Sequence, residues 1–323
     1  MNILKTGVVV VAALFSFTCF FSSAALASYT VAGTDEIADK EIQNKKKEKQ
    51  TRVKKKRGGK KEKTVITGGI EQRRAALQAS FRRAGISQDE IDEMFSDERI
   101  EIHHNIYMSP APKDGEQKKR KLSYFDEEFG LLNAESLESG KRIIAENKEI
   151  FERLEGLYGI PAHYIVAIIR VETNFKKHLG EYRVFNALYT MAMLSKRAKR
   201  VNMASKELVT WVKTCRKTDM DPFTVKGSWA GAFGIPQFMP SSYVIFAVDE
   251  NNDGAVDLYD YPDAFASVAN YLYRVGWQTG NEKKMRRAVY RYNHEKAYVN
   301  AVFAYAESLG ANSDNSMLNY PAP

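Results

Sequence analysis

The middle of the chain reads His163-Tyr164-Ile165-Val166-Ala167-Ile168-Ile169 and continues directly as Arg170-Val171-Glu172-Thr173-Asn174-Phe175. Residues 163–169 are apolar on almost every side, and a helix with that pattern is buried all round. Pro161 suits the first turn of such a helix, because its missing N–H needs no partner there. The sequence therefore predicts a central buried helix that carries Glu172 at its carboxyl end.

Two effects at this position raise the pKa of the Glu172 carboxyl group. Burial among apolar side chains disfavours the anion, and the negative end of the helix dipole does the same. A carboxylic acid that stays protonated near neutral pH is what a general acid for glycosidic cleavage requires. The alternative is a structural glutamate in an ion pair with Arg170 or Arg183, and these residues alone leave both interpretations open.

Helical periodicity continues on both sides of this helix. Residues 139–157 predict an amphipathic helix, and another begins near Ile70 and ends at Gly85. Ser87-Gln88-Asp89-Glu90 resembles a capping box that opens a third short helix. Further helices are predicted over 184–195, 203–216, 262–276 and 295–309. Strand signals are few, so the sequence predicts a mostly α fold.

A glycine-rich segment follows, Gly227-Ser228-Trp229-Ala230-Gly231-Ala232-Phe233-Gly234-Ile235-Pro236-Gln237-Phe238-Met239-Pro240-Ser241-Ser242-Tyr243. Its glycines permit tight turns and close backbone approach. Polar Ser228 and Gln237 interleave with aromatic residues, which suits a sugar site, and the alternative is a glycine-rich loop of the core. Tyr290-Arg291-Tyr292-Asn293, followed by Tyr298, is a weaker signal because Asn is an ordinary cap residue.

The stretch Asp249-Glu250-Asn251-Asn252-Asp253-Gly254-Ala255-Val256-Asp257-Leu258-Tyr259-Asp260 matches the spacing of an EF-hand calcium loop. The predicted Ca²⁺ ligands are the side chains of Asp249, Asn251, Asp253, Asp257 and Asp260. Ala255, at position 7 of the loop, is predicted to contribute its backbone carbonyl. Asp260 stands where a longer Glu is usual. A single loop favours a structural calcium site, and the alternative is a solvated Asp/Asn turn; no organic cofactor is predicted.

The amino-terminal part of the chain has the composition of an export signal. An apolar stretch over 8–21 and the small-residue site Ala25-Leu26-Ala27 predict a signal peptide over residues 1–27. An uncleaved anchor and lipidation at Cys19 are the alternatives. Residues 28–66 predict a lysine-rich disordered linker. We therefore expect a periplasmic protein, with membrane association left open.

Most of the positive charge lies in one tract. Residues 40–63 contain 13 Lys or Arg and 3 Glu, a net charge of +10, whereas the whole chain carries +8. The remainder, at −2, is near neutral, so the charge does not predict a nucleic-acid partner. The tract is either a solvated linker or an electrostatic tether to an anionic membrane or wall polymer.

Taken in order, these segments resemble the lytic murein transglycosylase B family. The resemblance covers about 139–280, with a further patch at 290–309. It rests on Tyr158-Gly159-Ile160-Pro161, Ile165 to Asn174, Tyr182-Arg183-Val184, Asn186-Ala187-Leu188, Gly227 to Tyr243, Ala247-Val248-Asp249 and Ser267-Val268-Ala269-Asn270-Tyr271. It implies a lysozyme-like helical catalytic domain, which we expect over 139–323. The helical periodicity before it predicts an N-terminal helical region over 67–138.

The resemblance also implies site residues and a reaction. Glu172 is the implied acid that protonates the bond between N-acetylmuramic acid and N-acetylglucosamine in peptidoglycan. The same carboxylate then takes the proton of the sugar's C6 hydroxyl as that oxygen attacks C1, which gives a 1,6-anhydro end. The implied substrate contacts are Ser228, Gln237, Tyr271, Tyr292, Asn293 and Arg197. Lys176-Lys177 follow the Glu-Thr motif where a small residue is common.

Two other functions remain open from the sequence. A muramidase would use water in place of the C6 hydroxyl, and ordinary retaining or inverting enzymes need a second carboxylate. Glu181 is the nearest candidate for that second group. A catalytically inactive glycan-binding scaffold is the alternative outside the enzymes.

Overall fold

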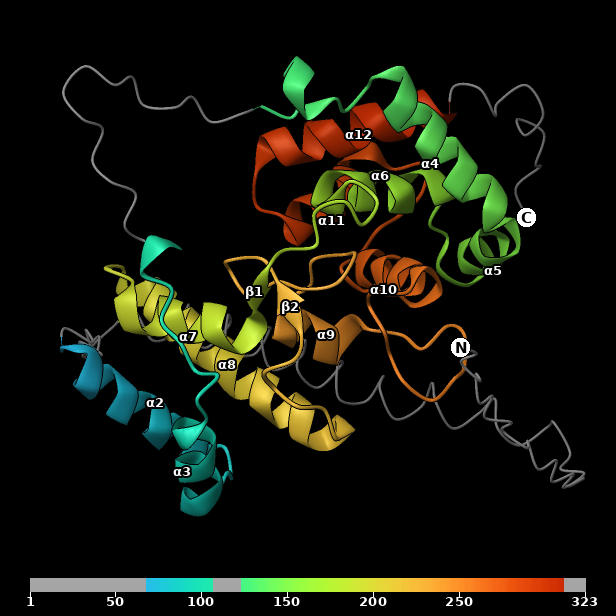
Figure 1. The fold of residues 1–323 in the computed structure, drawn as a ribbon. Helices are drawn as coiled ribbons and strands as arrows, with labels where there is room; N and C mark the ends of the chain where they lie inside the picture. The colour runs from blue at the N-terminus through green and yellow to red at the C-terminus, as the bar shows by residue number, and fades with distance from the viewer. Residues whose placement is uncertain (1–67, 107–122, 311–323) are drawn as a thin grey trace, which may run out of the picture. The chain divides into compact units, whose positions relative to one another are not determined.

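The structure is a computed structural model in which residues 68–106 and 123–310 are described (Figure 1). The predicted signal peptide, the 40–63 tract and Cys19 lie outside the described residues. None of the helices in the described ranges is both long and apolar enough to cross a membrane.

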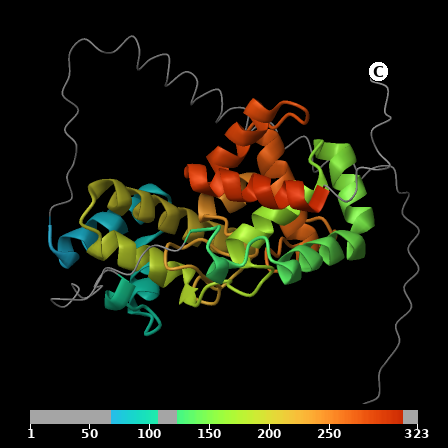
Figure 2. The ribbon, with the colours of Figure 1, turned by 90° about the horizontal axis from the view of Figure 1, so that it is seen from above.

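The central helix is α6, Ala162–Thr173, and it is buried without interruption from Tyr164 to Val171. Pro161 is its N-cap, one residue before the predicted first turn. The helices that pack against α6 are α4 (Ala134–Glu146), α5 (Lys148–Tyr158), α10 (Tyr261–Arg274) and α12 (Lys296–Gly310). Figures 1 and 2 show α12 running alongside α6. The prediction of a helix buried all round is confirmed.

The predicted helix over 139–157 is two helices, and that prediction was wrong in its extent. Asn147 has φ −120° and ψ 28°, and its side-chain Nδ2 donates to the carbonyl of Ile143 at 2.8 Å. This local hydrogen bond ends α4 and reverses the chain into α5. Gly159 ends α5 in the left-handed conformation, because a residue without Cβ adopts positive φ at no steric cost.

Three helices and a two-stranded sheet flank the glycine-rich segment. The helices are α7 (Val184–Leu194), α8 (Ala198–Thr218) and the short α9 (Pro240–Phe246). Helix α8 begins at Ala198, before the predicted start at residue 203. The prediction missed the first turn because that turn is cationic and too short to show apolar periodicity. Strands β1 (Tyr182–Arg183) and β2 (Lys226–Gly227) are antiparallel, with Tyr182 opposite Gly227. The sheet therefore fixes the start of the glycine-rich segment.

The N-terminal helices are α2 (Ile70–Arg83) and α3 (Gln88–Ser96). The predicted capping box is present: the backbone N–H of Glu90 donates to the Ser87 hydroxyl, and the Ser87 N–H donates to the Glu90 carboxylate at 2.8 Å. Helix α2 packs against α7 and α8. Two short 3₁₀ helices are η1 (His104–Ile106) and η2 (Glu127–Phe129).

Helix α11, Glu282–Tyr292, was not predicted, because five of its first six residues are charged and hide its apolar stripe. The side chain of Asn281 caps it by accepting from the Lys284 N–H at 3.1 Å. Helices α10 and α12 match their predicted ranges to within one residue at the start and two at the end. The mostly α architecture is confirmed.

Candidate active site

Glu172 lies in the last turn of α6 with its side chain half-buried. The hydroxyl of Tyr298 donates to its Oε1 at 2.7 Å. Burial raises the pKa of Glu172 to about 7, and the hydrogen bond from Tyr298 acts in the opposite direction. The group is therefore surrounded by protein, has partial access from solvent, and keeps its proton to a higher pH than an ordinary glutamate.

Neither arginine proposed as an ion-pair partner contacts Glu172 in the described residues. Arg170 is buried and donates to the Ser136 hydroxyl at 2.6 Å and to the carbonyls of Phe129 and Gly130, both at 2.9 Å. Arg183 pairs with Glu101 at 3.7 Å. The structural ion-pair interpretation of Glu172 was wrong.

Three tyrosine rings extend from Glu172 toward the glycine-rich segment. Tyr298 stacks on Tyr292 with ring centroids 6.3 Å apart, and Tyr292 meets Tyr271 edge-on at 4.7 Å. The Tyr292 hydroxyl donates to the carbonyl of Pro236 at 2.5 Å. Burial, followed by the nearby Glu172 charge, raises the pKa of Tyr292 and Tyr298 well above the usual value. These hydroxyls are therefore neutral donors at physiological pH.

Tyr124 forms a further side of the site from the segment before α4. Its ring lies edge-on to Tyr298 at 6.2 Å, and its hydroxyl donates to Glu295 at 3.4 Å. Sequence reasoning assigned no role to Tyr124 or Tyr298. The signal for Tyr298 was its position after the Tyr-Asn pair, whereas no local pattern marked Tyr124.

The glycine-rich segment is a compact turn system, as the glycines predicted. Gly231 and Gly234 have φ of +83° and +73°. The Ser228 N–H donates to the carbonyl of Ala232 at 2.7 Å, and its hydroxyl accepts from the Ala232 N–H at 3.2 Å. Trp229 is 45% exposed. This exposure of a large ring beside a polar turn suits contact with a ligand.

Gln237 and Glu172 lie on connected segments. The Thr173 hydroxyl, next to Glu172, donates to the carbonyl of Ile235 at 3.2 Å. Gln237 has φ of +49°, and its Nε2 donates to the carbonyls of Gly234 (2.9 Å) and Leu179 (3.2 Å). The end of α6 and the glycine-rich segment are therefore held together directly.

Two of the predicted substrate contacts, Asn293 and Arg197, have no described contact with Glu172. Asn293 is the C-cap of α11, one residue after Tyr292. Arg197 is the exposed N-cap of α8, and its N–H donates to the Ser195 hydroxyl at 3.3 Å. No contact in the described residues joins Arg197 to Glu172.

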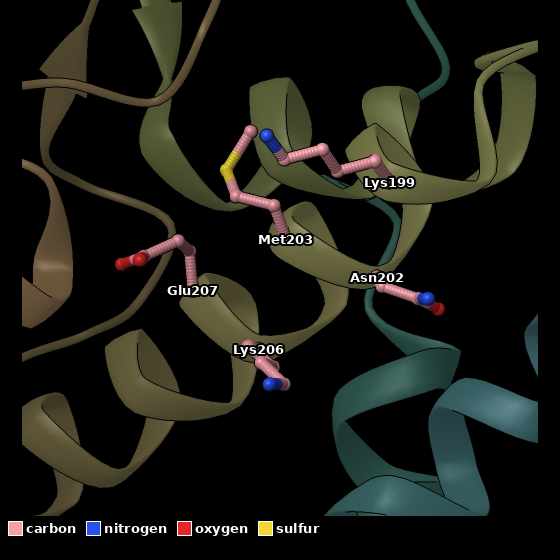
Figure 3. A pocket seen from close by; sticks show the side chains of 5 residues that line it. All are labelled: Lys199, Asn202, Met203, Lys206 and Glu207. Carbon is pink, nitrogen blue, oxygen red and sulfur yellow. The ribbon is translucent and has the colours of Figure 1, made fainter. Parts of the chain in front are cut away.

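A hollow of about 340 Å³ lies on α8 (Figure 3). It is lined by Lys199, Asn202, Met203, Lys206 and Glu207. Glu207 accepts from the N–H and hydroxyl of Ser241 and so caps the start of α9. The hollow contains none of the residues predicted for the site.

The 249–260 loop is organised by a residue that sequence reasoning missed. The carboxylate of buried Asp263 accepts from the N–H groups of Glu250 (2.8 Å), Asn251 (3.4 Å) and Asp257 (2.8 Å). Asp249 accepts from the Gly254 N–H at 3.0 Å through Oδ2. These bonds close the loop from one side.

The predicted calcium ligands are not gathered around one point. Across residues 68–106 and 123–310, no three His, Cys, Asp or Glu side chains lie close enough to hold a metal ion. One observation fits a cation: the Oδ1 atom of Asp249 is buried and has no hydrogen-bond partner. The loop therefore offers hard oxygen donors of the kind that calcium prefers, without a formed ligand cage.

Comparison with known proteins places these features in a family. A family profile described as Transglycosylase SLT domain matches residues 69–289. Membrane-bound lytic murein transglycosylase B of Escherichia coli strain K12 is 38% identical over 152 residues, 47% of this chain and 42% of that protein. The match thus spans less than half the length of this curated relative.

Solved structures share the fold. Soluble lytic transglycosylase SltB1 of Pseudomonas aeruginosa aligns with a TM-score of 0.65 and 24% identity over 75% of this chain and 99% of that chain. Slt35 of Escherichia coli in complex with calcium aligns with a TM-score of 0.62 and 22% identity, over 78% of this chain and 98% of that chain. SltB3 of Pseudomonas aeruginosa in complex with NAG-anhNAM-pentapeptide aligns with a TM-score of 0.63 and 24% identity, over 75% of this chain and 79% of that chain. Because the family profile covers more than half of the chain, this protein belongs to the transglycosylase SLT domain family.

Proposed function

We propose that this protein is a lytic transglycosylase that cleaves peptidoglycan glycan strands, with Glu172 as the catalytic acid and then the base. One observation carries the proposal. The Glu172 carboxyl ends a buried helix, keeps partial access to solvent and has its pKa raised to about 7 by burial. The substrate class follows from the family and from the relatives named as murein transglycosylases.

The reaction needs one carboxyl group that changes its protonation state twice. Protonated Glu172 gives its proton to the oxygen between N-acetylmuramic acid and N-acetylglucosamine, and the bond from C1 to that oxygen breaks. The carboxylate then accepts the proton of the C6 hydroxyl, whose oxygen forms a new bond to C1. The product is a 1,6-anhydro end, and Glu172 regains its proton for the next turnover. No water is consumed.

The surroundings of Glu172 favour this route over hydrolysis with a second carboxylate. A partner carboxyl at about 5 to 9 Å, as retaining and inverting enzymes have, would raise the pKa of Glu172 by charge repulsion. The shift of Glu172 comes from burial, opposed by the Tyr298 hydrogen bond, and from no other carboxylate. Glu181 is exposed and has no described contact with Glu172.

We assign substrate contacts to the residues around this carboxyl. Tyr271, Tyr292 and Asn293 lie on the α10 and α11 side, and Ser228 and Gln237 lie on the glycine-rich segment. Trp229 offers an exposed ring for an apolar sugar face. Arg197 is also kept as a proposed substrate contact, because it is exposed at the start of α8 and has no described contact with Glu172.

The test is the product released from purified sacculi. Wild-type protein should release muropeptides with anhydro ends, which mass spectrometry finds one water lighter than reducing ends and which borohydride does not reduce. Glu172→Gln should release none while it keeps the wild-type circular dichroism spectrum. Reducible ends would make the protein a muramidase, and pelleting with sacculi without any release would make it a glycan-binding scaffold. Full activity of Glu172→Gln would end the assignment of this residue.

We also propose that the 249–260 loop binds calcium as a structural ion. The proposed ligands are Asp249, Asn251, Asp253, Asp257 and Asp260, with the carbonyl of Ala255. The unpartnered Oδ1 of Asp249 supports this, as does a relative crystallised with calcium. The ion would offset repulsion among these carboxylates, and no step of the reaction passes through it.

We further propose export to the periplasm, where peptidoglycan lies. The proposed signal is residues 1–27, and the proposed tether to anionic lipid or wall polymer is the tract 40–63. Binding to vesicles that contain anionic lipid should fall steeply with added salt if the tract is a tether. Salt-independent binding, or none in the full chain, would leave the tract as a plain linker.

A further inference from the structure

The chain turns in an unusual conformation directly after the catalytic helix. Asn174, Phe175 and Lys176 have φ of +47°, +57° and +73° in succession. Residues with a Cβ atom occupy this left-handed region at an energetic cost, and three in a row persist only where surrounding contacts hold them. The turn is closed by the His178 N–H, which donates to the Thr173 carbonyl at 2.9 Å.

Each of the last two turn residues is held by an aromatic ring on a different helix. Phe175 packs on Tyr305 of α12 with centroids 6.4 Å apart. The Lys176 ammonium lies 4.2 Å from the ring centroid of Tyr261, at the start of α10. Tyr261 stacks on Phe265 at 5.2 Å and 13°, so the ring that receives the ammonium is itself fixed.

The neighbouring lysine has a different environment. Lys177 is exposed and pairs with Glu135, which is also exposed, at 3.1 Å. Lys176 is half-buried against Tyr261. Two adjacent lysines thus offer a test residue and a matched control within one turn.

We propose that Lys176, held over the ring of Tyr261, is a positioning residue that fixes the turn after α6 and with it the carboxyl of Glu172. This inference rests on the proposed function of Glu172. It follows from connectivity: Glu172 is two residues before Asn174, and Thr173 between them bonds the glycine-rich segment. A turn released at Lys176 lets the end of α6 fray and admits water to the carboxyl.

The other charged and titratable groups around Glu172 and around the contact of Lys176 with Tyr261 come from several elements. Tyr298, Tyr292 and Tyr124 face Glu172 from α12, α11 and the segment before α4. Arg142 and Glu146 of α4 lie near Tyr261 and carry opposite charges. None of these groups is altered in the variants below, so a change in the titration of Glu172 reports on the turn.

The experiment compares variants by NMR titration of the Glu172 carboxyl and by kcat and KM on sacculi. Lys176→Met and Tyr261→Leu remove the contact. Lys176→Arg and Tyr261→Phe keep it, because a guanidinium and a phenyl face still meet. Lys177→Met is the matched control.

Loss of the contact should lower the midpoint of Glu172 toward its ordinary value and lower kcat about threefold to tenfold, the range that one cation–π contact supplies, with KM little changed. The conservative variants and Lys177→Met should match wild type.

An unchanged Glu172 titration in Tyr261→Leu and Lys176→Met overturns the proposal, whatever the activity. The titration needs no substrate, so its result stands even if the reaction proposed for Glu172 is wrong. Failure of the proposed function would appear separately, as release of the same products from sacculi by wild type and by Glu172→Gln.

Discussion

Two influences with opposite effects set the pKa of Glu172. Burial raises the pKa, and the Tyr298 hydroxyl, which donates to the carboxylate, lowers it. A pKa of about 7 suits the proposed role of Glu172 as acid and then base in the same turnover. Each side of that balance can be changed separately.

Glu172→Gln should stabilise the protein at high pH. The folded pKa of about 7 exceeds the ordinary 4.5. The stabilising contribution of protonated Glu172 is therefore complete below 4.5 and is lost as the pH rises through about 7. At 1.36 kcal/mol per unit of pKa, the variant should gain up to ~3 kcal/mol at pH 8.5 and little at pH 4.5. Urea unfolding at both pH values measures this, with exposed Glu181→Gln as the control; an equal gain at both would contradict it.

Tyr298→Phe should move the alkaline limb of the pH–rate profile to higher pH. The variant keeps the ring stack on Tyr292 but removes the hydrogen bond that lowers the pKa of Glu172. Stability should fall by about 1 kcal/mol, the usual cost of a lost hydrogen bond. Tyr124→Phe is the control, because that hydroxyl bonds Glu295. A limb that stays in place in Tyr298→Phe would contradict the assigned role of its hydroxyl.

The connections between helices carry as much of the site as the helices do. Gly180, before β1, lies so close to β2 that a Cβ there would be 2.1 Å from the carbonyl carbon of Gly227. This close approach of two backbones sets where the glycine-rich segment leaves the sheet. A Cβ at either position would collide with backbone atoms of the glycine-rich segment.

Gly180→Ala should therefore destabilise the fold, and chemical denaturation measures the change. The added methyl group meets backbone that cannot give way, and φ of +94° is unfavourable for alanine, so a loss of more than about 2 kcal/mol is expected. Gly156→Ala in α5 is the matched control, since nothing lies within 4 Å of its Cβ position. That variant should gain about 0.5–1 kcal/mol from helix propensity. Similar changes in both variants would show that the close approach is absent.

The 249–260 loop should respond to calcium and to Asp263 independently. Calcium should raise the melting temperature of wild type but not of Asp249→Asn, because Asp249 offers the unpartnered oxygen. Asp263→Asn should lose about 1–3 kcal/mol with or without calcium, since its carboxylate accepts three backbone N–H groups. Thermal melts with calcium and with chelator decide both points. If calcium does not change the melting temperature of wild type, the loop is a turn held by Asp263 and not a calcium site.

Features set by neighbours in sequence were predictable, and features set by distant contacts were not. Continuous apolarity predicted the burial of α6, and the Ser87 to Glu90 spacing predicted a capping box that is present. The hydrogen bond from Tyr298 to Glu172 joins residues 126 positions apart, which no local pattern can indicate. The division of 139–157 at Asn147 depends on one side-chain hydrogen bond.

The same distinction applies to the candidate site. The Glu-Thr motif, the glycines and the tyrosines were visible as motifs, and the tertiary fold brings Glu172, Tyr292 and the glycine-rich segment into one connected set. Arg197 was predicted from the resemblance alone, and it is the exposed N-cap of α8 without a described contact with Glu172. Asp263 lay beyond the twelve-residue calcium pattern and so escaped attention, although it makes the bonds that shape the loop.

The most direct measurement is the titration of the Glu172 carboxyl itself in wild-type protein. Carbon-13 NMR of glutamate-labelled protein, with Glu172→Gln to identify the resonance by difference, gives the midpoint without any substrate. The midpoint should fall at about pH 7. A midpoint near 4.5, the ordinary value, would mean that water reaches the group freely and that it holds no proton to donate at neutral pH.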